Sequence, residues 1–165
     1  MNEMRVLIHA PRGRDATVVQ GVLAAQSIDA HICEQAADLM ACLAEGAASV
    51  ILTEEALPQL LADNRLPDWL QQQPPWSDFP FVVLASRREG RRPEKDFRSL
   101  HSLGNLVLLG RPLNAETLAS AAESAVRARR RQYAAREHLE ELKRTRTALG
   151  RLNGELEDRV LQRTP

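Results

Sequence analysis

Residues 49–58, SVILTEEALP, decide the fold, because a short apolar run ends abruptly in polar residues and a proline. The apolar part, 49–52, has the length of a buried strand, and its lack of alternation predicts a sheet that is covered on both faces. Four similar runs accompany it along the chain, at residues 4–8, 30–33, 81–84 and 106–109. The chain therefore contains five candidate strands.

Helical spacing of apolar residues fills the segments between these runs. It predicts a helix that Asp15 caps and that breaks at Ser27, a second that ends at Gly46, a third in pieces over 56–70, and a short one over 97–103. Strands that alternate with helices predict an α/β fold with a parallel sheet. We expect a flavodoxin-like, doubly wound sheet of five strands in the order 2-1-3-4-5.

In such a sheet, ligands bind at the carboxyl ends of the strands, here residues 9–12, 53–55, 85–87 and 110–112. The segments that end there are MRVLIHAP, SVILTEEALP, FPFVVLAS and LVLLGRPL, and in this order and spacing they resemble the receiver domain of two-component response regulators. The resemblance covers about residues 4–127. It implies a domain that phosphorylates itself, with an acidic pair for Mg²⁺ after strand one, an Asp nucleophile after strand three, a Ser or Thr after strand four and Lys-Pro after strand five.

The chain departs from that pattern at the metal site and at the nucleophile. Ala10 and Pro11 stand at the positions of the acidic pair, and neither offers the oxygen ligand that a hard divalent ion requires. Counting back four residues from Pro58 places Glu54, one methylene longer than Asp, at the phosphoacceptor position. We therefore expect no metal, no cofactor and no catalytic residue.

The remaining positions of the pattern are only partly kept. Ala85 stands at the hydroxyl position, with Ser86 one residue late, and Arg111-Pro112 replaces Lys-Pro. The sequence is thus interpreted as a degenerate receiver, or pseudo-receiver. Glu54 is either a carboxylate favoured by a nearby helix N-terminus or one half of a permanent ion pair with Arg111 that imitates an activated state. The resemblance also implies a cis bond before Pro112.

A long helix closes the chain. From Asn114, a natural N-cap, to about Gln162 no proline interrupts the sequence, which allows a helix of roughly 70 Å at 1.5 Å per residue. The spacing of the apolar residues up to Val126 is that of a face packed on the sheet. We therefore divide the chain into a receiver-like domain at 1–127 and a coiled-coil linker helix at 128–165.

The second part of this helix carries a heptad pattern. Position a is occupied by Ala135, Leu142, Leu149 and Leu156, and position d by His138, Thr145, Leu152 and Arg159. The seam is apolar mainly between Leu142 and Leu156, which predicts a parallel homodimer with this interface. His138 lacks the motif that surrounds a phosphorylated kinase histidine and is interpreted as a residue of the seam.

Charge and cysteine content limit the alternatives. Residues 127–165 hold 11 basic and 6 acidic groups, which leaves 11 and 16 for residues 1–126. No apolar run could span a bilayer, and no secretory signal begins the chain, so we expect a cytoplasmic protein. Cys33 and Cys42 are interpreted as two small buried thiols, since no CxxC motif is present and His9, His31 and His101 are scattered.

These patterns together predict a non-enzymatic input and dimerisation module of a signalling protein. The ending LEDRVLQRTP resembles linkers that lead into histidine-kinase or PAS modules, so we expect the output domain to follow in the same chain, with other signalling proteins as further partners. Three alternatives stay open. They are an RNA-binding antiterminator-like regulator that uses the basic stretch 127–131, an active phosphorelay receiver that uses Glu54 or Thr53, and a sensor whose Arg-rich loop 87–98 holds an anion.

Overall fold

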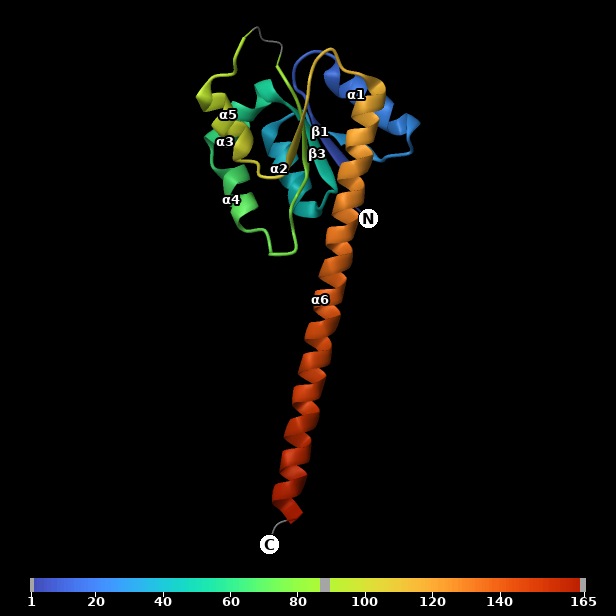
Figure 1. Ribbon diagram of the computed structural model, residues 1–165, viewed down its shortest axis with the longest axis vertical. Helices are drawn as coiled ribbons and strands as arrows, with labels where there is room; N and C mark the ends of the chain where they lie inside the picture. Colours follow the sequence, from blue (N-terminus) through green and yellow to red (C-terminus); the bar gives the residue numbers. More distant parts are fainter. Residues whose placement is uncertain (1, 87–89, 164–165) are drawn as a thin grey trace.

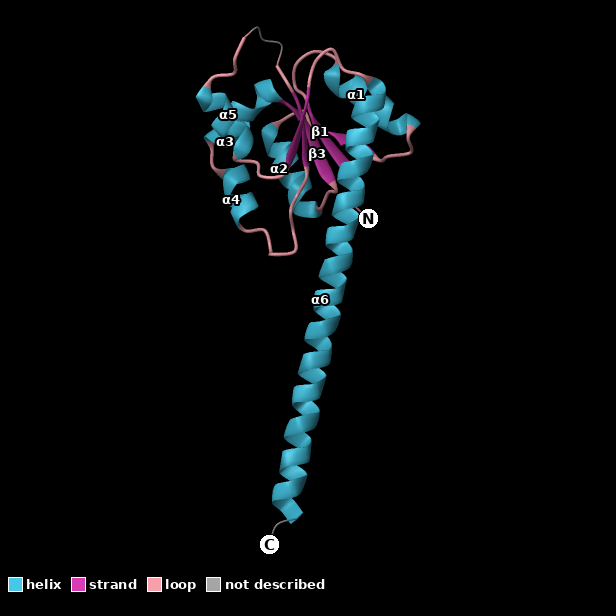
Figure 2. Ribbon diagram, in the orientation of Figure 1, coloured by secondary structure: helices cyan, strands magenta, loops and turns pink. Residues whose placement is uncertain are grey.

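The five apolar runs form one parallel sheet. The structure, a computed structural model, describes residues 2–86 and 90–163, and Figure 2 shows the strands at the centre of the domain. The strand order is β2-β1-β3-β4-β5, which confirms the predicted order 2-1-3-4-5. The strands are β1 (Val6–His9), β2 (Ala30–Ile32), β3 (Ser49–Thr53), β4 (Phe81–Leu84) and β5 (Leu106–Leu109).

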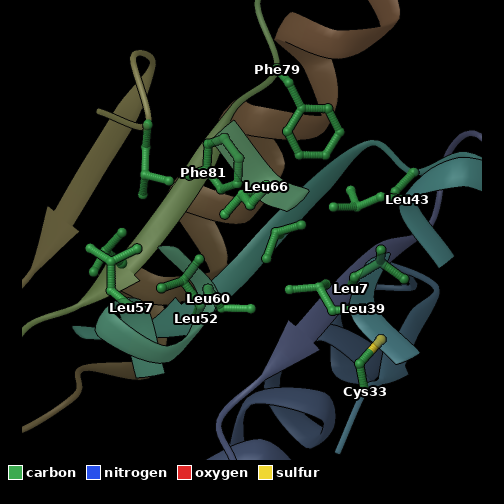
Figure 3. Close-up of a cluster of buried hydrophobic side chains, with 14 of the residues drawn as sticks. Leu7, Cys33, Leu39, Leu43, Leu52, Leu57, Leu60, Leu66, Phe79 and Phe81 are labelled. Atoms are coloured by element: carbon green, nitrogen blue, oxygen red, sulfur yellow. The ribbon is translucent and has the colours of Figure 1, made fainter. Parts of the chain in front are cut away.

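Alternate residues of the strands point into two separate apolar cores. On one face, Leu7, Val50 and Leu52 pack against helices α2 to α5, and Figure 3 shows this cluster. On the other face, Val6 and Ile51 pack against α1 and α6. The helices are α1 (Asp15–Ala25), α2 (Ala36–Glu45), α3 (Leu57–Ala62), α4 (Arg65–Gln71), α5 (Glu94–His101) and α6 (Ala115–Arg163), with a 3-10 turn η1 (Glu54–Ala56) before α3.

The prediction that both faces of the sheet are covered holds for β1, β3 and β4, whose residues are buried throughout. It is wrong for the edge strand β5, where Val107 and Leu108 are 48% and 37% exposed. An edge strand has only one neighbour, so its apolar residues are covered less completely than those of the central strands.

Local signals placed some helix ends correctly and missed others. Gly46 ends α2 as expected, with a φ of 121° that favours glycine. Asp15 is the first residue of α1 and makes no capping hydrogen bond, so its predicted role as the N-cap is wrong. Its carboxylate instead forms an ion pair with the guanidinium of Arg111, at 3.1 Å. Helix α5 begins at Glu94, three residues before the predicted start, because Pro93 at its N-cap sets the boundary.

Helix α6 is one continuous helix that leaves the domain (Figure 1). Asn114 caps it as predicted, with its side-chain oxygen accepting bonds from the N–H groups of Glu116 and Thr117 at 2.9 and 3.2 Å. Leu118, Ala122 and Ala125 are buried against the sheet. From residue 137 to 162 every side chain is exposed. None of the helices in the described part of the chain combines the length and apolarity that a membrane span needs.

Candidate functional site

The carboxyl ends of four strands bring the predicted site positions together. Ala10 follows β1, Glu54 follows β3, Ala85 follows β4 and Arg111 lies two residues after β5. The N–H of Ala85 donates to the carbonyl oxygen of Leu109 at 2.8 Å, so β4 and β5 stay paired up to the site. The parallel topology therefore gathers these residues at one edge of the sheet, as the sequence predicts.

Glu54 is the buried centre of this site. Its side chain is 6% exposed, and its two carboxylate oxygens accept bonds from Arg92 Nε at 2.6 Å and Arg92 Nη2 at 2.9 Å. One of the oxygens also accepts from the backbone N–H of Ser86 at 2.9 Å and from its hydroxyl at 3.2 Å. This two-point contact with a guanidinium is the strong geometry for an arginine–carboxylate pair.

The electrostatics keep Glu54 charged. Burial by itself raises the pKa of a carboxyl group, but the hydrogen bonds from Arg92 and from the Ser86 N–H outweigh burial and lower the pKa of Glu54 below its ordinary value of 4.5. The same pairing raises the pKa of Arg92. Both groups are therefore ionised at neutral pH, and each neutralises the other.

Of the two roles that the sequence leaves open for Glu54, the ion pair with Arg111 is wrong. Arg111 binds Glu55 through two contacts of 3.3 Å and Asp15 at 3.1 Å. The reason is the direction of the two neighbouring acids in η1: Glu54 faces the segment after β4, which contains Arg92, whereas Glu55 faces Arg111 at the end of β5. The bond before Pro112 is cis, as the resemblance implies.

Ala10 and Pro11 bring no carboxylate to this edge, and the acids that lie nearby are engaged with arginines. Ala10 is buried and Pro11 is exposed. A hollow of about 140 Å³ lies beside Glu54 and Ser86. Within residues 2–86 and 90–163, the acids at the strand ends do not form a group of three metal-binding side chains close enough to share an ion.

The loop that follows β4 supplied the residue that the sequence analysis missed. Arg92 falls inside the Arg-rich segment 87–98, for which the sequence suggests only a binding site for an external anion. Residues 87–89 of that segment lie outside the described residues. The anion that Arg92 binds is Glu54. The signal that could have found the pair is a carboxylate at the end of β3 together with an Arg-rich segment after the neighbouring strand β4.

The basic stretch 127–131 is not uniformly solvated. Arg129 is 5% exposed, and its guanidinium lies 4.9 Å from the Phe79 ring centre and 4.7 Å from that of Tyr133. Its Nη1 donates to the hydroxyl of Ser77 at 2.7 Å. Aromatic side chains before β4, together with Tyr133, cover this arginine, so its charge is not available to an external partner.

Two further residues extend the contact between α6 and the domain. The Tyr133 hydroxyl donates to the carbonyl oxygen of Ala47 at 2.8 Å, and Arg136 binds both carboxylate oxygens of Glu3 at 2.8 and 3.0 Å. These contacts lie past residue 127. We refer to this group as the α6 anchor cluster, which consists of Trp76, Phe79, Arg129, Tyr133 and Arg136.

The predicted seam of the coiled coil lies on the free part of α6. All seven residues proposed for the interface are exposed: Ala135, His138, Leu142, Thr145, Leu149, Leu152 and Leu156. The four leucines expose 54–65% of their surface. A row of large apolar side chains with this exposure is typical of a surface that forms a coiled coil.

The cysteines lie closer together than their spacing in the sequence suggests. Cys33 is buried and Cys42 is half-buried, so the prediction of two buried thiols is right for the first and wrong for the second. The scattered positions of the histidines in the sequence predict an isolated His31, but its imidazole nitrogen and the two sulfur atoms lie within 4.8 Å of one another. They converge because α2 packs over the end of β2.

Comparison with other proteins gives the fold. No protein-family model matches the chain, and no curated protein matches its sequence. Among solved structures, a CheY-like receiver domain protein from Methanospirillum hungatei matches with a TM-score of 0.60 and 12% identity over 80% of this chain and 99% of that one. The N-terminal domain of a response regulator/sensory box/GGDEF three-domain protein from Carboxydothermus hydrogenoformans matches with a TM-score of 0.55 and 17% identity over 74% of this chain and 94% of that one.

A third solved structure also covers the long helix. It is a fusion that contains a trimeric coiled-coil segment of yeast Spc42, and it matches with a TM-score of 0.57 and 16% identity over 92% of this chain and 95% of that one. At these identities the likeness concerns the fold alone. The chain has the fold of response-regulator receiver domains, extended by a long C-terminal helix.

Proposed function

We propose that this chain is a signal-input and dimerisation module, in which a receiver-like domain without phosphoryl-transfer chemistry passes conformational signals through a parallel coiled coil. The observation that carries the proposal is the buried Glu54–Arg92 pair. A receiver needs a free carboxylate and a bound cation at this place. Here the carboxylate is neutralised by an arginine of the same chain, and Ala10 and Pro11 offer no cation ligand.

The exposed part of α6, residues 137–162, is the segment proposed to pass the signal on. An isolated helix gains little stability in water, so a segment whose leucines are 54–65% exposed is expected to pair with another helix. Burial of one leucine side chain contributes about 1.5–3 kcal/mol, and the four leucines of each chain can therefore support association. The coiled-coil segment in the yeast Spc42 fusion supports this use of the helix, with a trimer as the competing state.

The α6 anchor cluster is the proposed connection between the domain and the coiled coil. Its contacts with Ala47 and Glu3 suggest that the folded unit extends to Arg136, and that the linker helix begins after that residue. A change in the position of β3 or of the N-terminal segment would thus act directly on α6. We place the output module, of the histidine-kinase or PAS type, beyond the coiled coil.

The absence of phosphoryl transfer is tested with the full chain. The protein is incubated with acetyl phosphate and Mg²⁺, and its intact mass is measured beside that of a phosphorylatable receiver domain in the same reaction. We expect the control to gain one phosphoryl group and this chain to gain none. A phosphorylated product of this chain would instead support the active phosphorelay receiver.

The dimerisation is tested by sedimentation of the full chain against a version that ends at Glu137. This end point keeps the α6 anchor cluster intact, whereas truncation at residue 127 would remove Arg129, Tyr133 and Arg136. We expect the full chain to sediment as a dimer and the shortened chain as a monomer with the same thermal stability of the domain. A monomeric full chain would refute the proposal, and a trimer would correct the number of helices.

A further inference from the structure

A second group of reactive side chains lies between β2 and α2, apart from the Glu54–Arg92 pair. His31 lies on β2, and Cys33 directly follows the last residue of that strand. The Cys33 N–H still donates to the carbonyl oxygen of Ile8 at 2.8 Å, so the chain stays extended there and the two side chains leave it on the same face. Cys42 comes from α2, which packs over that face. The imidazole nitrogen and the two sulfur atoms all lie within 4.8 Å of one another, and within the described residues no other group of histidine, cysteine and acidic side chains converges in this way.

The framework around these residues is fixed by other contacts. Helix α2 is held by the buried side chains of Leu39 and Leu43, and Figure 3 shows Cys33 beside Leu39 at one end of that core. The Arg5 side chain donates to the carbonyl oxygens of Cys42 and Gly46, each at 3.2 Å, which fixes the C-terminal end of α2. The three side chains thus converge because the fold brings β2 and α2 together.

A hydrogen bond from β1 holds the backbone at Cys33 in place. His9, which is buried, lies with its Nδ1 atom 2.8 Å from the carbonyl oxygen of Cys33. A carbonyl can only accept, so this nitrogen carries the proton and donates it. The backbone at Cys33 is therefore held by a side chain of β1.

The chemistry of the donors selects the class of ligand. Two sulfur atoms and one imidazole are the donors that Zn²⁺ takes in proteins, and they are poor ligands for Mg²⁺ or Ca²⁺. A tetrahedral zinc ion, with bonds of about 2.3 Å to sulfur and about 2.0 Å to nitrogen, holds its ligand atoms about 3.5–3.8 Å apart. The observed separations need to close by at most roughly 1.3 Å to reach these values. His31 is exposed and Cys42 is half-buried, so both can rotate toward Cys33.

We propose that His31, Cys33 and Cys42 bind a Zn²⁺ ion with three protein ligands and one position open to solvent. Each thiol loses its proton to the solvent when the metal–sulfur bond forms, and two thiolates balance the two charges of the ion. The open position faces the side of His31, the exposed member of the group. The site joins the end of the edge strand β2 to α2 and shares no residue with the Glu54–Arg92 pair or with the proposed coiled-coil seam.

The test uses the full chain, kept reduced, with Co²⁺ as the spectroscopic probe and Zn²⁺ as the competitor. We expect one Co²⁺ per chain, with the sulfur-to-cobalt charge-transfer band of thiolate ligation, and displacement of the cobalt by one equivalent of Zn²⁺. Cys42→Ser and His31→Gln should each weaken binding by more than the roughly 10–100-fold that loss of a supporting outer-shell residue costs.

The matched control is His101→Gln, which removes an exposed histidine at the end of α5 and should leave the titration unchanged. Circular dichroism of each variant shows whether the fold is kept. The absence of a charge-transfer band in the reduced wild-type chain would overturn the proposal. Unchanged affinity in either variant, or a charge-transfer band of undiminished intensity in Cys42→Ser, would refute the assignment of the replaced residue as a ligand.

Discussion

Replacement of Glu54 by Gln tests the central pair of the site. The substitution keeps the size of the side chain and removes its charge. Arg92 and the backbone N–H of Ser86 both donate hydrogen bonds to the carboxylate, and the amide of Gln offers them an NH₂ donor in place of one acceptor oxygen. We expect the folded state to lose stability, and the loss to be larger than for any exposed carboxylate of the domain.

The magnitude follows from burial and geometry. Removal of one partner from a fully buried ion pair costs about 3–5 kcal/mol. The Arg92 side chain is 22% exposed and can be partly rehydrated, so we expect about 2 kcal/mol. For a protein of this size, that loss lowers the melting temperature by about 4–8 °C.

The effect has a defined dependence on pH. The pKa of Glu54 in the folded protein lies below its ordinary value of 4.5, so the pair contributes fully above that value. The contribution is lost as the pH falls through the lowered folded-state pKa, because the folded protein then takes up the proton. The difference between wild type and Glu54→Gln should therefore be constant near neutral pH and should shrink in acid.

Urea unfolding of the two proteins at neutral and acidic pH measures both effects. Glu55→Gln is the matched control, since that neighbouring carboxylate is 32% exposed and its contacts to Arg111 are 3.3 Å long. The control should cost no more than about 1 kcal/mol. Equal stability of Glu54→Gln and wild type at neutral pH, or a larger effect in the control, would refute the reasoning from burial.

Three further substitutions probe α6. Tyr133→Phe removes the hydroxyl that bonds to the domain backbone and should cost about 1 kcal/mol in urea unfolding. Leu149→Asp places a charge in the seam and should convert the full chain to a monomer in sedimentation, whereas Val18→Asp, at an exposed position of α1, should not. Glu3→Gln removes the pair with Arg136; because that arginine lowers the pKa of Glu3, the loss, about 1 kcal/mol or less, should be present at neutral pH and fade in acid.

The sequence was informative where one local pattern decides the structure. The sheet order follows from five apolar runs separated by helical segments, and the start of α6 follows from Asn114, whose side chain caps the helix. The convergence of Glu54, Ala85 and Arg111 at one edge follows from parallel topology alone. These features need no knowledge of which side chains touch.

The partners of charged side chains could not be predicted in the same way. Glu54 and Glu55 are adjacent and chemically alike, and only the direction that η1 gives each of them assigns one to Arg92 and the other to Arg111. The burial of Arg129 depends on aromatic residues some fifty positions earlier in the chain, a relation that no periodicity reports. Distant contacts of this kind require the packed structure.

The straightness of α6 fixes the direction in which its leucines point. At 3.6 residues per turn, Leu142 lies about 180° around the helix axis from Tyr133, and Leu149 about 160°. The domain occupies the Tyr133 side, so a second helix can approach the opposite side without meeting it. Two chains joined there would carry their domains on the outside of a central rod, and one residue inserted between Arg136 and Leu142 would turn the leucines by about 100° toward the domain.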